Sequence, residues 1–205
     1  MDTVTKTWHS DYRVKGSKFL GYLAPATTLD EAEQILNNIK AEHPTATHHC
    51  YAYRINPNEP DEFATDDGEP GGTAGLPILN SAKAYNLINI VLIVVRYYGG
   101  TKLGKAGLIE AYGHTAELTI KKAKLYKILP LKTFKIVYDY PHQGLIDKLK
   151  HDFTWIELES SYLEKVTLKC GCPVSKADRF LAALKKSAHL FDDIDVTGET
   201  FHIVK

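Results

Sequence analysis

Long hydrophobic runs, a cysteine framework and a recognisable signal peptide are all missing from this sequence. The longest apolar run, Ile90 to Val95, is far too short to span a bilayer, so no membrane segment is expected. The three cysteines, Cys50, Cys170 and Cys172, do not suggest a disulfide framework. The stretch from Met1 to Tyr12 is polar and mixed in charge, unlike a signal peptide. Together these features predict a cytoplasmic protein in a reducing setting.

An excess of positive or negative charge is missing as well. Among the 205 residues, 25 lysines and arginines balance 25 aspartates and glutamates, so the formal net charge is zero. Such a chain lacks the broad basic field that drives non-specific binding to nucleic acids, and any such contact must depend on a local patch. The length suffices for one large domain or two small ones, each with its own core.

Glycine, by contrast, is concentrated between residues 65 and 107. An acidic Gly-rich loop opens this stretch, and a basic one closes it directly after Arg96. Between them, the β-branched run that begins at Ile90 is typical of a strand buried on both faces. Because glycine lets backbone come close to a ligand, the turn at Gly99 and Gly100 beside the arginine marks a candidate site.

Hydrophobic periodicity and turn residues divide the first part of the chain into seven segments. They are a strand 18–25, a helix 29–42, a strand 48–55, an exposed loop 56–72, a helix 73–85, a buried strand 89–97 and a helix 105–124. At the start of the first helix, the Thr28 hydroxyl can cap free amides and Glu31 can reach back, which predicts a capping box.

The order of elements changes after residues 128–131, which contain Pro130 and are interpreted as a domain boundary. The elements expected beyond it are strands 131–139, 153–159, 162–170 and 194–204 and helices 142–151 and 176–188, the second helix capped by Ser175. This βαββαβ order is the ferredoxin-like arrangement. We therefore predict an α+β fold in two domains, residues 1–127 and 131–205.

The basic loop offers one candidate chemistry. Residues 99–105 fit the G-x-x-x-x-G-K pattern of a P-loop, and they lie between an expected strand and an expected helix. Ala106 stands where a hydroxyl group would hold Mg²⁺, which disfavours NTPase chemistry. The loop can still take an anion at the helix N-terminus, with Arg96 and Lys102 close by.

The acidic loop offers a second candidate, a metal or acid–base site. Its members would be Asp66, Asp67 and Glu69, with His48 or His49 from the preceding strand. The spacing matches no EF-hand or zinc pattern, and adjacent strand residues point to opposite faces, so only one histidine can serve the site. In the alternative interpretation, Asp67 and Gly68 form a turn, Glu69 pairs with Arg96 or Lys102, and one histidine fills the core.

Thiol chemistry and a recognition surface are the remaining candidates. Cys170 and Cys172 form a C-x-C pattern rather than a redox C-x-x-C pattern, so we expect them to be buried apolar residues. Tyr97 and Tyr98 beside Arg96 can stack on bases or anchor a protein interface. In the alternative interpretation, one of the two rings simply packs inside the domain.

Two long motifs resemble the signature of the Impact/YigZ family. They are Asp67-Gly68-Glu69-Pro70-Gly71-Gly72-Thr73-Ala74-Gly75 and Val95-Arg96-Tyr97-Tyr98-Gly99-Gly100-Thr101-Lys102-Leu103-Gly104. Residues 15–19 and 46–53 are also similar to the family, so the resemblance covers roughly residues 1–125. The part from 131 to 205 resembles the C-terminal domain of bacterial members through its order of elements.

The resemblance implies a fold and a role. The N-terminal domain would share the fold of the second domain of a small-subunit ribosomal protein, and the two domains would resemble the fourth and fifth domains of elongation factor G. Eukaryotic Impact proteins regulate translation by binding the activator of a starvation-responsive initiation-factor kinase. We therefore expect a translation-linked regulatory binding protein that contacts RNA, the ribosome or an associated protein, partly by analogy of fold.

The expected ligand-binding residues lie in the two loops. They are Asp67, Gly68, Glu69, Thr73, Gly75, Arg96, Tyr97, Gly99, Gly100, Lys102 and Gly104. Arg96 and Lys102 would contact phosphate or carboxylate, and Thr73 would cap the next helix or donate to the ligand. The two acidic residues would position the basic pair. No metal or cofactor is expected, and the oligomeric state is not set by the sequence.

The alternative function is a hydrolase or phosphoryl-handling enzyme in the same cleft. Asp67 or Glu69 would act as its base, and His48 or His49 would assist.

Overall fold

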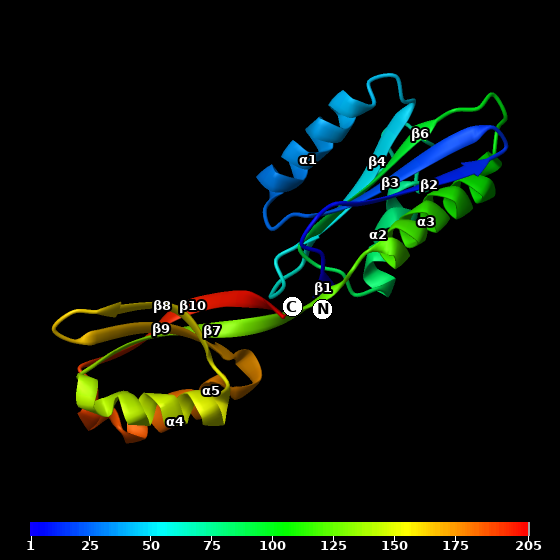
Figure 1. Ribbon diagram of the computed structural model, residues 1–205. Helices are drawn as coiled ribbons and strands as arrows, with labels where there is room; N and C mark the ends of the chain where they lie inside the picture. Colours follow the sequence, from blue (N-terminus) through cyan, green and yellow to red (C-terminus); the bar gives the residue numbers. More distant parts are fainter. Residues whose placement is uncertain (205) are drawn as a thin grey trace. The chain divides into compact units, whose positions relative to one another are not determined.

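The computed structural model describes residues 1–204, and the chain divides into two compact units. Unit 1 is Met1–Lys127, and unit 2 is Ile128–Val204 (Figure 1). Each unit combines a β-sheet with packed helices, which confirms the predicted α+β class. Within the described range, no helix is both long and apolar enough to cross a membrane.

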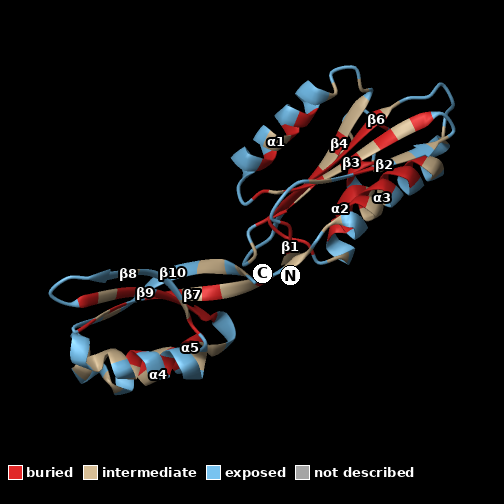
Figure 2. Ribbon diagram, in the orientation of Figure 1, coloured by how far each residue is buried: buried red, intermediate tan, exposed pale blue. Residues whose placement is uncertain are grey.

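Unit 1 is an antiparallel sheet with helices on both faces. Its strands, in sheet order, are β2 (Trp8–Val14), β3 (Ser17–Pro25), β6 (Ile90–Tyr97), β4 (His48–Ile55) and β5 (Asp61–Thr65). One face is covered by α1 (Leu29–Glu42), and the other by α2 (Gly75–Ala84) and α3 (Gly104–Lys122). Figure 2 shows buried residues along the sheet and on the helix sides that face it.

The central strand β6 divides its side chains between two cores. Ile90, Leu92 and Val94 pack with α2 and α3, whereas the alternate residues Val91 and Val95 pack with α1. This follows from the two-residue period of a strand. A strand with helices on both faces must be apolar at every position, which explains the uninterrupted run.

The first helix begins where the capping box predicts. The Glu31 N–H donates to Thr28 Oγ1 at 3.2 Å, and the Glu31 carboxylate accepts from the backbone N–H of Thr27 at 2.6 Å. Glu31 therefore reaches back one residue further than the capping box requires. Both the hydroxyl cap and the bounds of the helix 29–42 are confirmed.

Unit 2 has the βαββαβ order of a ferredoxin-like domain. Its elements are β7 (Tyr126–Tyr138), α4 (Gln143–Phe153), β8 (Ile156–Tyr162), β9 (Val166–Pro173), α5 (Val174–Lys186) and β10 (Asp193–Val204), with short 3-10 turns at Tyr140–His142 and Ala188–Leu190. The strands lie in the order β10-β7-β9-β8. Phe134 and Ile136 of β7 and Leu168 and Cys170 of β9 form a core with Phe180 of α5.

Several predicted elements differ from the structure. The interval 56–72 is not all loop, because β5 pairs with β4 as an edge strand despite its charges. No strand is predicted for β2, although it pairs with β3 along its whole length. Pro130 lies inside β7 rather than in a linker. Tyr126 and Lys127, the first two residues of that strand, still belong to unit 1 and pair there with β1 (Asp2–Thr3). The N-cap of α5 is Pro173, so Ser175 is not its cap.

Candidate functional site

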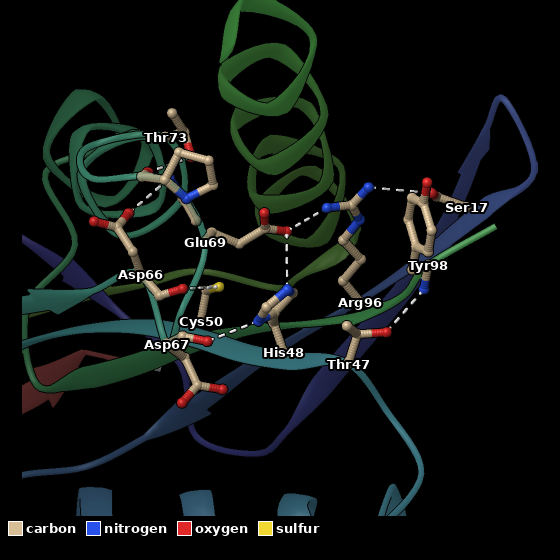
Figure 3. A network of polar contacts seen from close by, with 12 residues as sticks. Ser17, Thr47, His48, Cys50, Asp66, Asp67, Glu69, Thr73, Arg96 and Tyr98 are labelled. Atoms are coloured by element: carbon tan, nitrogen blue, oxygen red, sulfur yellow. Dashed lines mark hydrogen bonds and ion pairs between the residues drawn. The ribbon is translucent and has the colours of Figure 1, made fainter. Parts of the chain in front are cut away.

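The end of β6 brings an arginine into contact with the acidic loop. Arg96 continues the alternation of Leu92 and Val94, so its side chain lies on the α2/α3 face of the sheet. Its Cα partners across the sheet are Phe19 of β3 and His48 of β4. Figure 3 shows the side chains of Arg96, His48 and Glu69 turned toward one another.

Arg96 and Glu69 form a buried ion pair. Arg96 Nη1 donates to Glu69 Oε1 at 2.5 Å, and the two residues are only 5% and 9% exposed. The Tyr112 hydroxyl donates to the same carboxylate oxygen at 2.8 Å. The guanidinium is also in cation–π contact with the rings of Phe19 and Tyr98, whose centroids are 5.4 and 5.3 Å from Arg96 Cζ. Since a buried charge is costly unless paired, this arrangement fixes the arginine in one place.

One nitrogen of this guanidinium donates no hydrogen bond within the described residues. Arg96 Nη2 donates to Ser17 Oγ at 3.4 Å, but the buried Nε has no hydrogen-bond partner within residues 1–204. Nearly all buried polar atoms in proteins have a partner, and exceptions call for a specific reason. A binding site is one such reason.

A tight turn carries Glu69 back to the arginine. Asp67 and Gly68 both have positive φ angles, 43° and 86°, and the Glu69 N–H donates to Asp66 O at 2.9 Å. Glycine readily adopts this left-handed conformation, and aspartate tolerates it better than most residues. The predicted turn and the predicted pairing of Glu69 with Arg96 are therefore confirmed.

His48 is the histidine that faces the site. Its Nδ1 lies 2.7 Å from Asp67 O, and a carbonyl oxygen can only accept, so Nδ1 carries the proton. Its Nε2 is 3.8 Å from Glu69 Oε1. His49 lies on the opposite face, where its Nε2 is 3.2 Å from His43 O. As predicted, only one of the two histidines serves the site.

Asp66 organises the acidic loop. Its carboxylate accepts from the backbone N–H groups of Gly72 (2.8 Å), Ala74 (2.8 Å) and Gly75 (2.9 Å), at the start of α2. Burial raises the pKa of this carboxyl, but these backbone donors outweigh burial and lower the pKa below its ordinary value. Asp66 therefore caps α2, and Thr73 instead donates its hydroxyl to Pro70 O at 2.6 Å.

A cavity of about 550 Å³ opens beside the ion pair. Its lining comes from both loops, the end of β6 and the start of α3: Thr47, His48, Glu69, Pro70, Arg96, Tyr98, Lys102, Leu103, Gly104, Lys105 and Leu108. Lys102 and Lys105 are exposed, and Glu69 is the one carboxylate in the lining. The first turn of α3 has neither an acidic residue nor a side-chain cap. Free helix amides and surplus cations both favour an anion here.

Other predicted site residues lie away from this cavity. Tyr97 is on the α1 face, where its hydroxyl is 3.0 Å from His43 Nδ1, so Tyr98 rather than Tyr97 borders the cavity. The Asp67 carboxylate accepts from the backbone N–H of His49 at 2.6 Å and does not position the basic pair. Neither Asp67 nor His49 therefore lies where a base for hydrolysis is needed. Of the residues named for the alternative hydrolase, Glu69 and His48 line the cavity, and the Glu69 carboxylate is held there by Arg96 and Tyr112.

The glycines predicted to contact a ligand serve different structural requirements. A Cβ at Gly99 would lie 1.9 Å from the Gly16 carbonyl carbon, and one at Gly75 would lie 2.7 Å from the backbone of Thr65. These two positions serve close backbone packing. Gly100 and Gly104 instead have φ angles of 83° and 72° and open space around them, so the basic loop needs them for its conformation. Gly68 lies against the His48 ring.

Comparison with known proteins identifies the family. Residues 15–120 match the Impact N-terminal domain, and residues 136–186 match a domain of unknown function, DUF1949. The chain is 34% identical to the IMPACT family member YvyE of Bacillus subtilis over 164 residues, which are 80% of this chain and 76% of that protein. It is 32% identical to the IMPACT family member YigZ of Escherichia coli over 173 residues, 83% and 85% of the two chains. The chain belongs to the Impact family.

A solved structure agrees with this assignment. A crystal structure of a hypothetical protein superposes with a TM-score of 0.65 at 27% identity, covering 100% of this Impact-family chain and 97% of the other. The resemblance seen in the two loop motifs is thus confirmed, as is the two-unit α+β fold.

The thiols of this Impact-family chain are structural. Burial raises the pKa of Cys50 and of Cys170 to about 12 and that of Cys172 to about 11. All three are buried, and Cys50 Sγ donates to Asp66 O at 3.0 Å behind the acidic loop. Thiols with raised pKa values are poor nucleophiles at neutral pH. Nor does any group of three His, Cys, Asp or Glu side chains among residues 1–204 have the arrangement of a metal site.

Sequence reasoning missed several members of the site. Ser17, Thr47, Leu108 and Tyr112 lie outside the two loop motifs, and Lys105 is noticed only as part of the P-loop pattern. The signal that could have found Tyr112 is its helical spacing from Leu108, since residues four apart share a helix face.

Proposed function

We propose that this chain is a translation-linked regulatory binding protein that holds phosphate groups of ribosomal RNA in the cavity at the end of β6. Membership of the Impact family supports the link to translation, which the resemblance of the two motifs already implied. The observation that carries the RNA contact is the charge of the cavity lining. Three permanent cations, Arg96, Lys102 and Lys105, face a single carboxylate, Glu69.

Each part of the lining has a role in this proposal. A phosphate group would lie at the N-terminus of α3, where free amides and the positive end of the helix dipole favour an anion. Lys102 and Lys105 would add charge from the rim. The Tyr98 ring, 46% exposed, would stack on a base. Because the whole chain has no net charge, attraction to RNA has to come from a local patch, and we assign it to this one.

The test is co-sedimentation of the purified protein with ribosomes and ribosomal subunits across a salt series. The informative variant is Lys102→Ala with Lys105→Ala, because both side chains are exposed and neither is part of a buried pair. Arg96 is unsuitable, since its removal would leave Glu69 buried without its partner. Lys148→Ala with Lys185→Ala removes the same charge from exposed positions of unit 2 and is the matched control.

We expect salt-sensitive binding by the wild type and by the control. The cavity variant should bind more weakly at every salt concentration, with the slope of log K against log salt smaller by roughly 2, about one for each phosphate that a lysine no longer neutralises. Equal binding by wild type and cavity variant would overturn the role of the cavity. Absence of wild-type binding at low salt would overturn the ribosomal RNA contact and leave a protein partner as the route to translation.

A further inference from the structure

A second surface of unit 1 has the features of a docking edge. β5 lies at the end of the sheet order and pairs with β4. Across residues 1–204, no other strand is bonded to its outer side. An open edge presents a row of backbone N–H and C=O groups to which an extended segment of another chain can add as a further strand.

Aromatic rings form a ladder beside this edge. Tyr53 and Phe63 are cross-strand partners, and their rings stack at 5.6 Å with an interplanar angle of 20°. The Tyr51 ring lies 5.8 Å from the Phe63 ring on the same face. Phe63 is 44% exposed. Edge strands are normally kept free of large exposed apolar side chains, so an aromatic ladder at an open edge suggests a binding surface.

Three carboxylates lie near the ladder, and no lysine or arginine among residues 1–204 pairs with them. Partial burial, followed by the nearby charges of Glu33 and Asp67, raises the pKa of the Tyr51 hydroxyl. Burial, followed by the nearby charges of Asp61 and Glu33, likewise raises the pKa of the Tyr53 hydroxyl. In the described part of the chain, none of these three carboxylates forms an ion pair with a lysine or arginine. The aromatic face of the edge is therefore acidic.

The other face of β5 is already neutralised. Glu62 accepts from Arg54 Nε at 2.8 Å and also pairs with Lys83. The unpaired negative charge beside β5 thus lies on the aromatic side of the edge. Its partner must bring cations to that side and need not bring them to the other.

We propose that β5 accepts an extended basic segment of a partner protein as a sixth strand of the sheet. Lysine or arginine at every second position of that segment would lie over the aromatic rings and near the carboxylates of Glu33 and Asp61. Cation–π contact, charge attraction and backbone pairing would then act together. This surface is on the α1 face of the sheet and does not depend on the cavity or on the proposed function.

A second copy of this chain fits the edge poorly. An antiparallel pairing centred on Phe63 would place Asp61 opposite Thr65 and Glu62 opposite Ala64 of the other copy. The strand Asp61–Thr65 contains two carboxylates and no lysine or arginine, so a second copy would bring more negative charge and no cation to an edge that is already acidic. The same carboxylates that suit a basic strand therefore oppose pairing of β5 with itself.

The test measures fluorescence anisotropy of a labelled hexapeptide, Arg-Thr-Arg-Thr-Arg-Thr, titrated with the full chain. A peptide with glutamate in place of arginine is the charge control. Two further peptides carry N-methyl groups at alternate residues, one at the arginines and one at the threonines, because a strand added to an edge uses only one of the two sets of N–H groups. We expect binding of the basic peptide, none of the acidic peptide, and loss for only one N-methylated form.

Variants locate the surface. Phe63→Ala, and separately Glu33→Gln with Asp61→Asn, should each weaken binding roughly fivefold. Leu163→Ala and Glu164→Gln with Asp178→Asn make matched changes at exposed positions of unit 2 and should leave binding unchanged. Absence of binding by the basic peptide, equal binding of the acidic peptide, retention by both N-methylated forms, or wild-type binding by both β5 variants would each overturn the proposal.

Discussion

The two units differ in whether they bury charged side chains. Unit 1 buries three charged side chains, Arg54, Glu69 and Arg96. Among the described residues of unit 2, no charged side chain is buried. Burying an ion costs free energy unless partners and hydrogen bonds replace its water, so a fold keeps such groups only where they have a purpose. The contrast supports our proposal that the functional site of this chain is in unit 1.

The architecture of the two sheets explains how this difference is possible. Helices cover both faces of the unit 1 sheet, so a charge at the end of its central strand is enclosed by α3, β3 and the acidic loop. In unit 2, α4 and α5 pack on one face, and β8 and β10 are largely exposed. Polar side chains of the uncovered face, such as Lys135 and Lys169, remain in contact with water and need no special partner.

The largest effect that this comparison predicts belongs to the buried pair. Arg96→Ala should lower the free energy of unfolding by about 3–5 kcal/mol, because Glu69 would stay buried without its cation. Urea denaturation monitored by circular dichroism measures the change. The double variant Arg96→Met with Glu69→Leu should recover much of the loss, since an apolar pair can replace a buried ion pair. A single variant as stable as the wild type would show that Glu69 does not need its cation to stay buried.

A smaller effect is expected at Asp66, and it should depend on pH. The pKa of this carboxyl is lowered in the folded state, so its stabilising contribution is present above its unfolded pKa and is lost as the pH falls through the folded pKa. Asp66→Asn should therefore cost about 1 kcal/mol at pH 7, as for the loss of a helix cap, and clearly less near pH 3. Paired urea titrations at the two pH values test this. An equal loss at both would indicate that charge is not what Asp66 contributes.

The sequence predicted those parts of the site that depend on local rules. The period of β6, continued past Val95, assigns Arg96 and Tyr97 to opposite faces, so the choice of Tyr97 as a ligand contact could have been avoided. The turn at Asp67 and Gly68 could also be predicted from the sequence, because few residue pairs adopt positive φ so readily. Both inferences need only neighbouring residues.

What the sequence could not supply depends on contacts between distant segments. Asp66 caps a helix that begins nine residues later, a distance that no capping rule spans. β5 contains two acids in five residues, and only its pairing with β4 makes it a strand. The lysines of the cavity rim meet the acidic loop because β6 and β4 are neighbours in the sheet.

The smallest effect should come from the most extensive ion pairing in unit 2. Lys165 pairs with Asp192 and lies 3.7 Å from Asp139, but all three side chains are well exposed. Exposed pairs gain little, because water and salt screen their attraction and two long side chains lose freedom. Lys165→Ala should therefore leave the urea midpoint unchanged within error, at low salt and at high salt alike. A loss of stability comparable to that of Arg96→Ala would mean that unit 2 depends on an exposed ion pair as strongly as unit 1 depends on its buried pair. The distinction between the two units would then fail.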